Sequence, residues 1–151
     1  MRDNISIQRV DLLHPKAKEN FRKFIEDAES ILNIKLRVTQ GLRTFPEQQA
    51  LYNQGRTSPG KKVTNAKPGQ SYHNYGLAID VVRMDGDKPD WNYDLSKLVP
   101  MANKYGIFWG GNFKKFKDFP HFEMTFGNGW RELLAKYNNK DFIAGTNYVK
   151  I

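Results

Sequence analysis

The apolar residues in the first third of the chain recur at helical spacing and then at strand spacing. From Pro15 to Leu32, apolar side chains return at three- and four-residue steps, which predicts an amphipathic helix that begins at Pro15. Residues 34 to 39 then alternate apolar and polar side chains and contain β-branched residues, which predicts a half-buried strand that ends at Gly41.

A second helix and a long loop are predicted to follow this strand. Thr44 and Glu47 have the spacing of a capping box, so the helix is expected to begin at Thr44, to run to about Gln54 and to stop at Gly55. Residues 55 to 70 are rich in Gly, Pro and polar side chains, which indicates a surface loop. Loops of this length in compact domains are usually functional.

The second half of the chain alternates short apolar runs with turn-forming residues. Leu77 to Val82 is predicted to be a buried strand, and a helix is predicted from Leu95 to Tyr105, in which Pro100 introduces a break or a kink. The remaining predicted elements are strands at residues 107 to 109, 121 to 125 and 148 to 151 and a short helix at residues 130 to 137. Together they predict an α+β fold with a small central antiparallel sheet flanked by helices, in one domain spanning residues 1 to 151.

Composition narrows the chemistry that this domain can support. The chain has no cysteine, so a metal ion would have to be bound by His, Asp or Glu. Its formal net charge of +8 favours polyanionic partners, which include nucleic acid, anionic lipid and anionic cell-wall polymers. No helix-turn-helix or zinc-finger pattern is present, so specific nucleic-acid binding is not expected.

The chain lacks the sequence features of export and membrane insertion. The first residues have no basic segment followed by an apolar run, and no stretch of ~18 apolar residues occurs that would span a bilayer. We therefore expect a soluble, monomeric protein that is cytoplasmic on synthesis.

Two of the three histidines lie in segments that combine acids with apolar residues. An ionised carboxylate at Asp80, inside Ala-Ile-Asp-Val-Val, needs a cation or a basic partner. His73, Asp80 and His121 would together make a ligand set typical of catalytic zinc. The seven-residue spacing of His73 and Asp80 leaves alternatives open, because it places them on one face of a helix but on opposite faces of a strand. Gly76 and the β-branched residues after it favour a bend at residues 74 to 76 followed by a strand, which would turn both side chains to one place. A buried Asp–Arg pair and a hydrogen-bonded core histidine remain possible interpretations.

These residues belong to a pattern, Ser-x-His-x-x-Gly-x-Ala-x-Asp followed about forty residues later by Asp-x-x-His, that resembles a family of zinc peptidases. The family contains D-alanyl-D-alanine carboxypeptidases and L-alanyl-D-glutamate endopeptidases, and the greatest similarity is to phage endolysins and related cell-wall endopeptidases. The similarity covers roughly residues 12 to 126. Its further motifs are Gly41 to Thr44, Glu47-Gln48, Leu51-Tyr52, Gln54 to Arg56, Trp109 to Gly111 and Asp118 to Glu123.

The resemblance implies a role for each matching residue. His73, Asp80 and His121 would bind one zinc ion, Asp118 would be the catalytic carboxylate, and Arg43 would orient the substrate. Glu123 is the competing candidate for the base, because it shares a strand face with His121. The family pattern favours Asp118, which leaves Glu123 as a hydrogen-bond partner of a ligand imidazole. Ser71 would donate a hydrogen bond into the site or cap the loop.

The same resemblance implies the fold and the function. The expected fold is that of D,D-peptidases and of the related hedgehog signalling domain. The expected activity is zinc-dependent hydrolysis of the L-alanyl-D-glutamate bond of the peptidoglycan stem peptide, by a phage or prophage endolysin that causes bacterial lysis after release from the cytoplasm. The alternatives are a D-alanyl-D-alanine carboxypeptidase of the same family and a non-catalytic, zinc-holding module that binds the cell wall. Anionic wall polymers are possible partners.

Three features lie outside this core interpretation. Phe113 stands where close relatives carry a second tryptophan, which removes an indole N–H. Asp85, Asp87 and Asp90 could hold a second hard cation such as calcium, or form a solvated turn. His14 has no partner at metal-ligand spacing and is expected to be structural or exposed to solvent.

Overall fold

The computed structural model describes all 151 residues and is organised around an antiparallel sheet. Its strands are β1 (Lys35–Gln40), β2 (Ala78–Asp85), β3 (Lys88–Asp90), β4 (Phe108–Trp109) and β5 (His121–Glu123). The order across the sheet is β1-β2-β5-β4, and β3 pairs with the end of β2 through a tight hairpin. The expected α+β fold with a small antiparallel sheet is confirmed.

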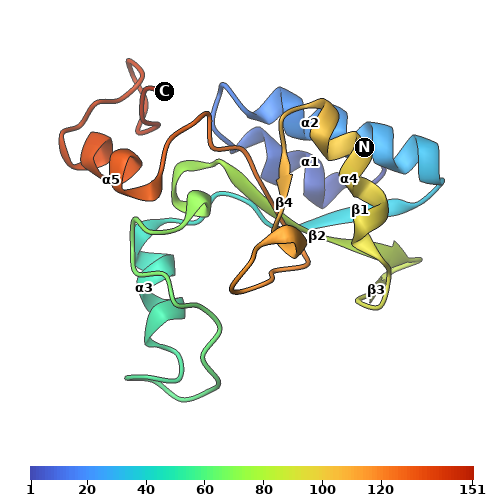
Figure 1. Cartoon of the computed structure of the whole chain (residues 1–151), viewed down its shortest axis with the longest axis horizontal. Coiled ribbons are helices and arrows are strands. Elements are labelled where there is room, and N and C mark those ends of the chain that lie inside the picture. The colour runs from blue at the N-terminus through green and yellow to red at the C-terminus, as the bar shows by residue number, and fades with distance from the viewer.

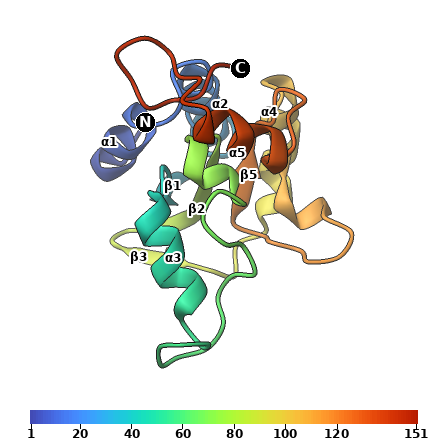
Figure 2. The ribbon, with the colours of Figure 1, turned by 90° about the vertical axis from the view of Figure 1, so that its left-hand side faces the viewer.

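The helices are distributed unequally around this sheet. Helices α1 (Asn4–Asp11), α2 (Lys18–Leu32) and α4 (Val99–Lys104) lie together over one face, whereas α3 (Phe45–Asn53) and its loop extend away on the other side (Figures 1 and 2). Helix α5 (Trp130–Asn138) and the C-terminal tail lie at one end of the molecule. Short 3-10 helices occupy Tyr72–Tyr75 (η1), Leu95–Leu98 (η2) and Gly110–Asn112 (η3). None of the helices is long and apolar enough to span a membrane.

The hydrophobic core fills the space between the sheet and the helices that cover it. The ring of Phe24 on α2 meets that of Phe122 on β5, with ring centroids 5.1 Å apart, and both side chains are fully buried. Ile79 and Val81 on β2 belong to the same core cluster. Because successive side chains of a strand alternate between faces, Asp80 points to the opposite side of the sheet, which the core helices leave open.

Most of the predicted elements are present, with shifted ends. The capping box at Thr44 is formed, because Glu47 N donates to Thr44 Oγ1 at 3.2 Å and Thr44 N donates to Glu47 Oε1 at 3.1 Å. The predicted helix from Leu95 to Tyr105 divides into η2 and α4, with Pro100 in the first turn of α4, which confirms the break.

Three expectations about secondary structure were wrong or incomplete. Helix α1 was not predicted, because Ser6 and Val10 are its only buried residues and no helical repeat of apolar residues results. Helix α2 begins at Lys18 instead of Pro15, since a turn at His14 precedes it. The predicted strand at residues 148 to 151 forms only an isolated bridge between Phe142 and Val149.

His14 is buried and structural, the first of the two alternatives expected for it, and it is not exposed to solvent. Its Nε2 lies 2.7 Å from the carbonyl oxygen of Val149, and its Nδ1 accepts the N–H of Lys16 at 3.1 Å. Burial lowers the pKa of this imidazole. A neutral His14 therefore ties the C-terminal tail to the turn before α2.

Asp3 joins α1 to the sheet and gives a prediction for stability in acid. Its buried carboxylate accepts the N–H and the hydroxyl of Ser6 and is paired with Arg37 of β1 at 2.9 Å. The Arg37 hydrogen bond is the largest cause that lowers the pKa of Asp3 to about 2. A lowered folded-state pKa stabilises the fold above the unfolded pKa, and this contribution disappears as pH falls through the folded value.

We expect the difference in unfolding free energy between the wild type and Asp3→Asn to shrink by about 2 kcal/mol as the pH falls from 5 to 2. Urea denaturation at a series of pH values measures it. The pair with Arg37 would have no such role if the difference were independent of pH.

Candidate metal centre

Three side chains that are distant in the sequence converge on the open face of the sheet. His73 comes from η1, Asp80 from β2 and His121 from β5. Asp80 Oδ1 lies 3.3 Å from both His73 Nε2 and His121 Nδ1, and the potential ligand atoms all lie within 4.8 Å of one another. No other group of three or more His, Asp or Glu side chains in the chain has this geometry.

The local structure explains how the three residues meet. Asp80 and His121 are direct partners in the pairing of β2 with β5, so their side chains share one face of the sheet. His73 lies in η1, before the strand begins, and the chain turns back at Gly76 with a φ of 69°. This left-handed turn requires glycine, because a Cβ at Gly76 would also lie 2.6 Å from the backbone nitrogen of His14.

The hydrogen bonds on the outer side of the imidazoles fit a metal-binding arrangement. His73 Nδ1 lies 2.8 Å from the carbonyl oxygen of Gly41, and His121 Nε2 lies 2.7 Å from Glu123 Oε1. These acceptors hold the protons of the outer nitrogens, which leaves the inner nitrogen of each ring facing Asp80. Two imidazole nitrogens and one carboxylate oxygen directed at one point suit a borderline cation such as zinc.

The protonation of this cluster reflects its mutual contacts. Burial raises the pKa of Asp80, but the hydrogen bonds from His121 and His73 outweigh burial and lower it overall. Burial lowers the pKa of His121, whereas Asp80 and Glu123 raise it to about 9. A cation bound here would therefore replace a proton on His121.

Asp118 lies beside this cluster at the rim of the cleft. Its Oδ2 is 3.9 Å from His121 Nδ1, the nitrogen that faces Asp80, and its side chain is 54% exposed. Desolvation in the cleft raises the pKa of Asp118. Gly110 allows this approach, because a Cβ there would overlap the carbonyl oxygen of Asp118 and lie 3.0 Å from His121 Cβ.

Arg43 also lines the cleft and is held by amide side chains. Its Nη1 donates to Gln48 Oε1 at 3.0 Å, and its Nε and Nη2 each donate to Gln40 Oε1 at 3.4 Å. Burial lowers the pKa of Arg43, and the nearby charges of Asp80, Glu47 and Asp118 oppose that shift. The guanidinium is thus fixed in direction by groups that carry no charge.

Gln48 contacts two residues that line the cleft, Arg43 and Ala66, and sequence reasoning gave it no role. It is fully buried on α3, and its Nε2 donates to the carbonyl oxygen of Ala66 at 2.8 Å. Through Arg43 and Ala66, Gln48 connects the guanidinium to the long loop of residues 55 to 70. The motif Glu47-Gln48, which is part of the family resemblance, was the available signal for Gln48. The position of Gln48 in a short helix does not show that its amide side chain is buried.

Ser71 and Phe113 also have defined positions. Ser71 caps η1 by accepting the N–H of His73 at 3.2 Å, so the capping alternative describes its contact. Phe113 lies with its ring centroid 5.9 Å from that of His121. Both residues line a cleft of about 460 Å³. The same cleft contains Arg43, Asp118 and the three potential metal ligands His73, Asp80 and His121, which form the metal cluster of this chain.

Of the two alternatives for Asp85, Asp87 and Asp90, the second cation is not supported, whereas a solvated turn fits the exposed Asp85 and Asp87. Asp87 lies in the exposed turn of the β2–β3 hairpin, and Asp85 is the strand residue beside that turn. Asp90 is paired with Arg83 at 3.0 Å. These acids form no ligand cluster, because the hairpin separates them and an arginine already balances one charge.

Comparisons with known proteins identify the family of the chain. The family model described as D-alanyl-D-alanine carboxypeptidase matches residues 64 to 124, which include the metal cluster and Asp118. The peptidoglycan L-alanyl-D-glutamate endopeptidase CwlK of Bacillus subtilis is 42% identical over 74% of this chain and 73% of its own length. An L-alanyl-D-glutamate peptidase of a Listeria phage is 30% identical over 82% of this chain, which spans 45% of that protein.

A solved structure supports the same assignment. The L-Ala D-Glu endopeptidase ChiX of Serratia marcescens is 25% identical and superposes with a TM-score of 0.62, covering 82% of this chain and 88% of its own. The fold and the shared sequence define a peptidase. The chain belongs to the family that comprises D-alanyl-D-alanine carboxypeptidases and L-alanyl-D-glutamate endopeptidases.

Proposed function

We propose that the protein is a zinc-dependent endopeptidase that hydrolyses the L-alanyl-D-glutamate bond of the peptidoglycan stem peptide. The observation that carries this proposal is the convergence of His73, Asp80 and His121 in a cleft that also contains an exposed carboxylate and a buried arginine. The names of the Bacillus and Listeria phage relatives support the choice of bond.

The metal would be held by the three converging side chains. A zinc ion held there would supply Lewis acidity and lower the pKa of a bound water molecule. Glu123 and the carbonyl oxygen of Gly41 keep the two imidazoles in the correct tautomer and orientation. The open face of the sheet admits the substrate from the solvent side.

Asp118 is the better candidate for the general base. It lies on the side of His121 that faces the metal cluster, and it is exposed to the cleft. Glu123 lies on the outer side of the same ring, is hydrogen-bonded to Nε2 and is buried. Asp118 would take a proton from the attacking water and return it to the leaving amine, and its raised pKa suits that exchange.

Arg43 would position the substrate. A guanidinium fixed by Gln48 and Gln40 presents a directed positive charge in the cleft. The D-glutamate residue of the stem peptide carries a free carboxylate beside the scissile bond, which is a suitable partner for this charge. The same charge would also stabilise the oxyanion that develops on the scissile carbonyl.

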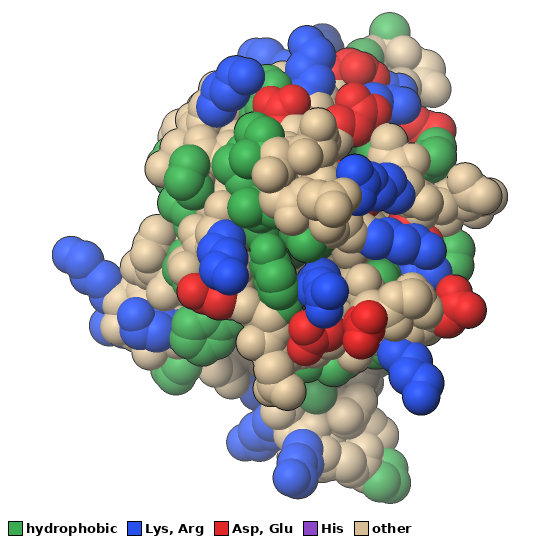
Figure 3. All heavy atoms as spheres, turned by 90° about the vertical axis from the view of Figure 1, so that its right-hand side faces the viewer, with side chains coloured by type: hydrophobic (Ala, Val, Ile, Leu, Met, Phe, Trp, Pro, Cys, Tyr) green, Lys and Arg blue, Asp and Glu red, His purple; other side chains and the backbone are tan.

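The positive charge of the chain favours capture by anionic wall polymers. Figure 3 shows Lys and Arg side chains spread over one face of the molecule with acidic side chains between them. Six exposed lysines lie in the two loops that border the cleft: Lys61, Lys62, Lys67, Lys114, Lys115 and Lys117. Attraction of this kind is screened by salt. A role as a phage or prophage endolysin, which reaches the wall after release from the cytoplasm, fits this charge and the Listeria phage relative.

Digestion of purified peptidoglycan tests the proposed function. We expect the metal-free protein to be inactive, zinc to restore hydrolysis, and the newly freed amino terminus to belong to D-glutamate, because the zinc site supplies the Lewis acid. Release of D-alanine would instead indicate a carboxypeptidase. Binding of zinc and of the wall without hydrolysis would indicate a non-catalytic module, and activity without zinc would contradict the proposal.

A further inference from the structure

A small aromatic hollow lies next to the catalytic cleft and takes no part in the proposed chemistry. It has a volume of about 210 Å³. Trp91 is 62% exposed and Phe119 is 55% exposed, and both line this one hollow. A contiguous exposed apolar patch, unlike a single exposed residue, is a mark of a binding site. The lining residues that matter here are Asp90, Trp91, Tyr93, Asp94, Trp109 and Phe119.

The aromatic side chains of this hollow are held at fixed angles to one another. Trp109 Nε1 donates to the carbonyl oxygen of Phe119 at 2.7 Å, and the two rings lie 5.9 Å apart with an interplanar angle of 56°. Tyr93 lies beneath Arg83 and Lys97 in two cation–π contacts. Trp91 has no such partner, so its indole face is available to a ligand.

The chemistry of the lining suits a sugar ring. Pyranose rings present C–H faces that stack on aromatic side chains and hydroxyl groups that donate hydrogen bonds to carboxylates. Asp90 and Asp94 supply carboxylate oxygens at the same hollow, and each is already oriented, the first by Arg83 and the second by the N–H of Ser96. The exposed rings and the fixed acceptors thus occur together.

The position of the hollow connects it to the reaction. Phe119 and Pro120 line it, whereas Asp118, the residue before them, lines the cleft. The hydrogen bond from Val81 N to the carbonyl oxygen of Pro120, at 2.9 Å, fixes this segment against β2. In peptidoglycan the stem peptide is joined to the glycan through L-alanine, so a scissile L-alanyl-D-glutamate bond lies within about two residue lengths, ~7 Å, of the sugar linkage.

We propose that this hollow binds an amino-sugar ring of the glycan strand that carries the stem peptide. The inference rests on the proposed function, because the scissile bond sets how near the sugar must lie. It assigns Trp91 and Phe119 to substrate recognition and makes glycan-linked stem peptides better substrates than free ones.

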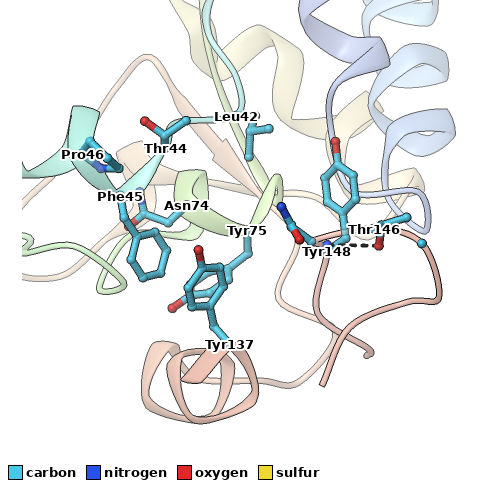
Figure 4. A pocket seen from close by; sticks show the side chains of 11 residues that line it. Leu42, Thr44, Phe45, Pro46, Asn74, Tyr75, Tyr137, Thr146 and Tyr148 are labelled. Carbon is cyan, nitrogen blue, oxygen red and sulfur yellow. Dashed lines mark hydrogen bonds between the residues drawn. The ribbon is translucent and has the colours of Figure 1, made fainter. Parts of the chain in front are cut away.

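A larger hollow provides a matched control. Figure 4 shows this space, of about 640 Å³, with Phe45, Tyr75, Tyr137 and Tyr148 around it. It lies behind the wall of the cleft. Thr44 and Asn74 line this hollow, whereas Arg43 and His73, the residues that precede them in the sequence, line the cleft. A stem peptide at the metal cluster would have to pass around that wall to place its sugar there.

The test compares Trp91→Ala with Tyr137→Ala. For each variant, kcat/KM is measured on a glycan-linked muropeptide and on the same stem peptide without sugar. We expect the ratio of the two values to fall by about tenfold in Trp91→Ala, the size expected for loss of one aromatic stacking partner, and to be unchanged in Tyr137→Ala. An unchanged ratio in Trp91→Ala, or a reduced ratio in Tyr137→Ala, would overturn the inference.

A second measurement separates this inference from the proposed function. Calorimetric titration of the chelator-treated protein with an N-acetylglucosamine trimer needs no peptide bond and no metal. Saturable binding that Trp91→Ala abolishes and Tyr137→Ala retains supports the hollow, even if neither peptide substrate is cleaved. No saturable binding by the wild type, or equal binding by Trp91→Ala, contradicts it, even if both substrates are cleaved.

Discussion

Asp118→Asn is expected to lower kcat on isolated peptidoglycan by about 10²- to 10⁴-fold, while one zinc ion per chain remains bound. The amide has nearly the shape of the carboxylate but cannot accept the proton of the attacking water. Asp118 lies 3.9 Å from His121 Nδ1 and is not part of the converging metal cluster, so its replacement leaves the ligand atoms in place. Release of new amino termini measures kcat, and metal analysis of the dialysed protein measures zinc content.

Glu123→Gln is the matched variant for this experiment. Glu123 contacts the outer nitrogen of His121 at 2.7 Å, so its loss should weaken zinc affinity by about 10- to 100-fold. Added zinc should then recover activity in Glu123→Gln and should not do so in Asp118→Asn. The reverse pattern, with Asp118→Asn active and Glu123→Gln inactive at saturating zinc, would make Glu123 the base.

The fold was largely predictable because local patterns and tertiary packing agree. Helix α2 carries a long apolar stripe, and the Thr44–Glu47 capping box fixes the start of α3 without help from distant residues. The short helix α1 could not be predicted in the same way. Its N-cap Asp3, which accepts the N–H of Ser6, is a local signal, but only Ser6 and Val10 are buried, so no apolar repeat accompanies it, and the contact of Asp3 with Arg37 of β1 joins residues that lie 34 positions apart.

The site was predictable only in part, for a geometric reason. The position of an acid within an apolar strand sequence pointed to Asp80, and the pairing of β2 with β5 brings His121 opposite it. The spacing of His73 and Asp80 could not decide between a helix and a strand, and the structure has neither alone. A 3-10 turn followed by a left-handed glycine places His73 beside the strand, which a periodicity argument cannot represent.

The surroundings of the site were less predictable than its centre. Gln48 orients Arg43 through contacts between α3, η1 and the long loop, none of which has a regular sequence repeat. The acidic residues after β2 suggested a cation site, but a hairpin and an ion pair with Arg83 disperse them. The residue types alone therefore indicated that this region is acidic. Which groups the carboxylates contact depends on the pairing of β2 with β3.

Asp80→Ala is expected to abolish both wall digestion and the stabilisation of the fold by zinc. Asp80 is the carboxylate that both imidazoles face, and without it two neutral donors remain for a divalent cation. A ligand that binds only the folded state stabilises it by about 4 kcal/mol when its concentration is 1,000 times its Kd. Thermal unfolding with and without zinc should therefore show a large rise in Tm for the wild type and none for Asp80→Ala.

Asp85→Ala is the control for this last experiment, since Asp85 lies on the same strand, is exposed and belongs to no ligand cluster. It should keep both the zinc-dependent rise in Tm and the activity. A rise that survives in Asp80→Ala but disappears in Asp85→Ala would move the metal to the β2–β3 hairpin. It would also remove the argument that an acid stands in the apolar β2 sequence because a cation compensates its charge.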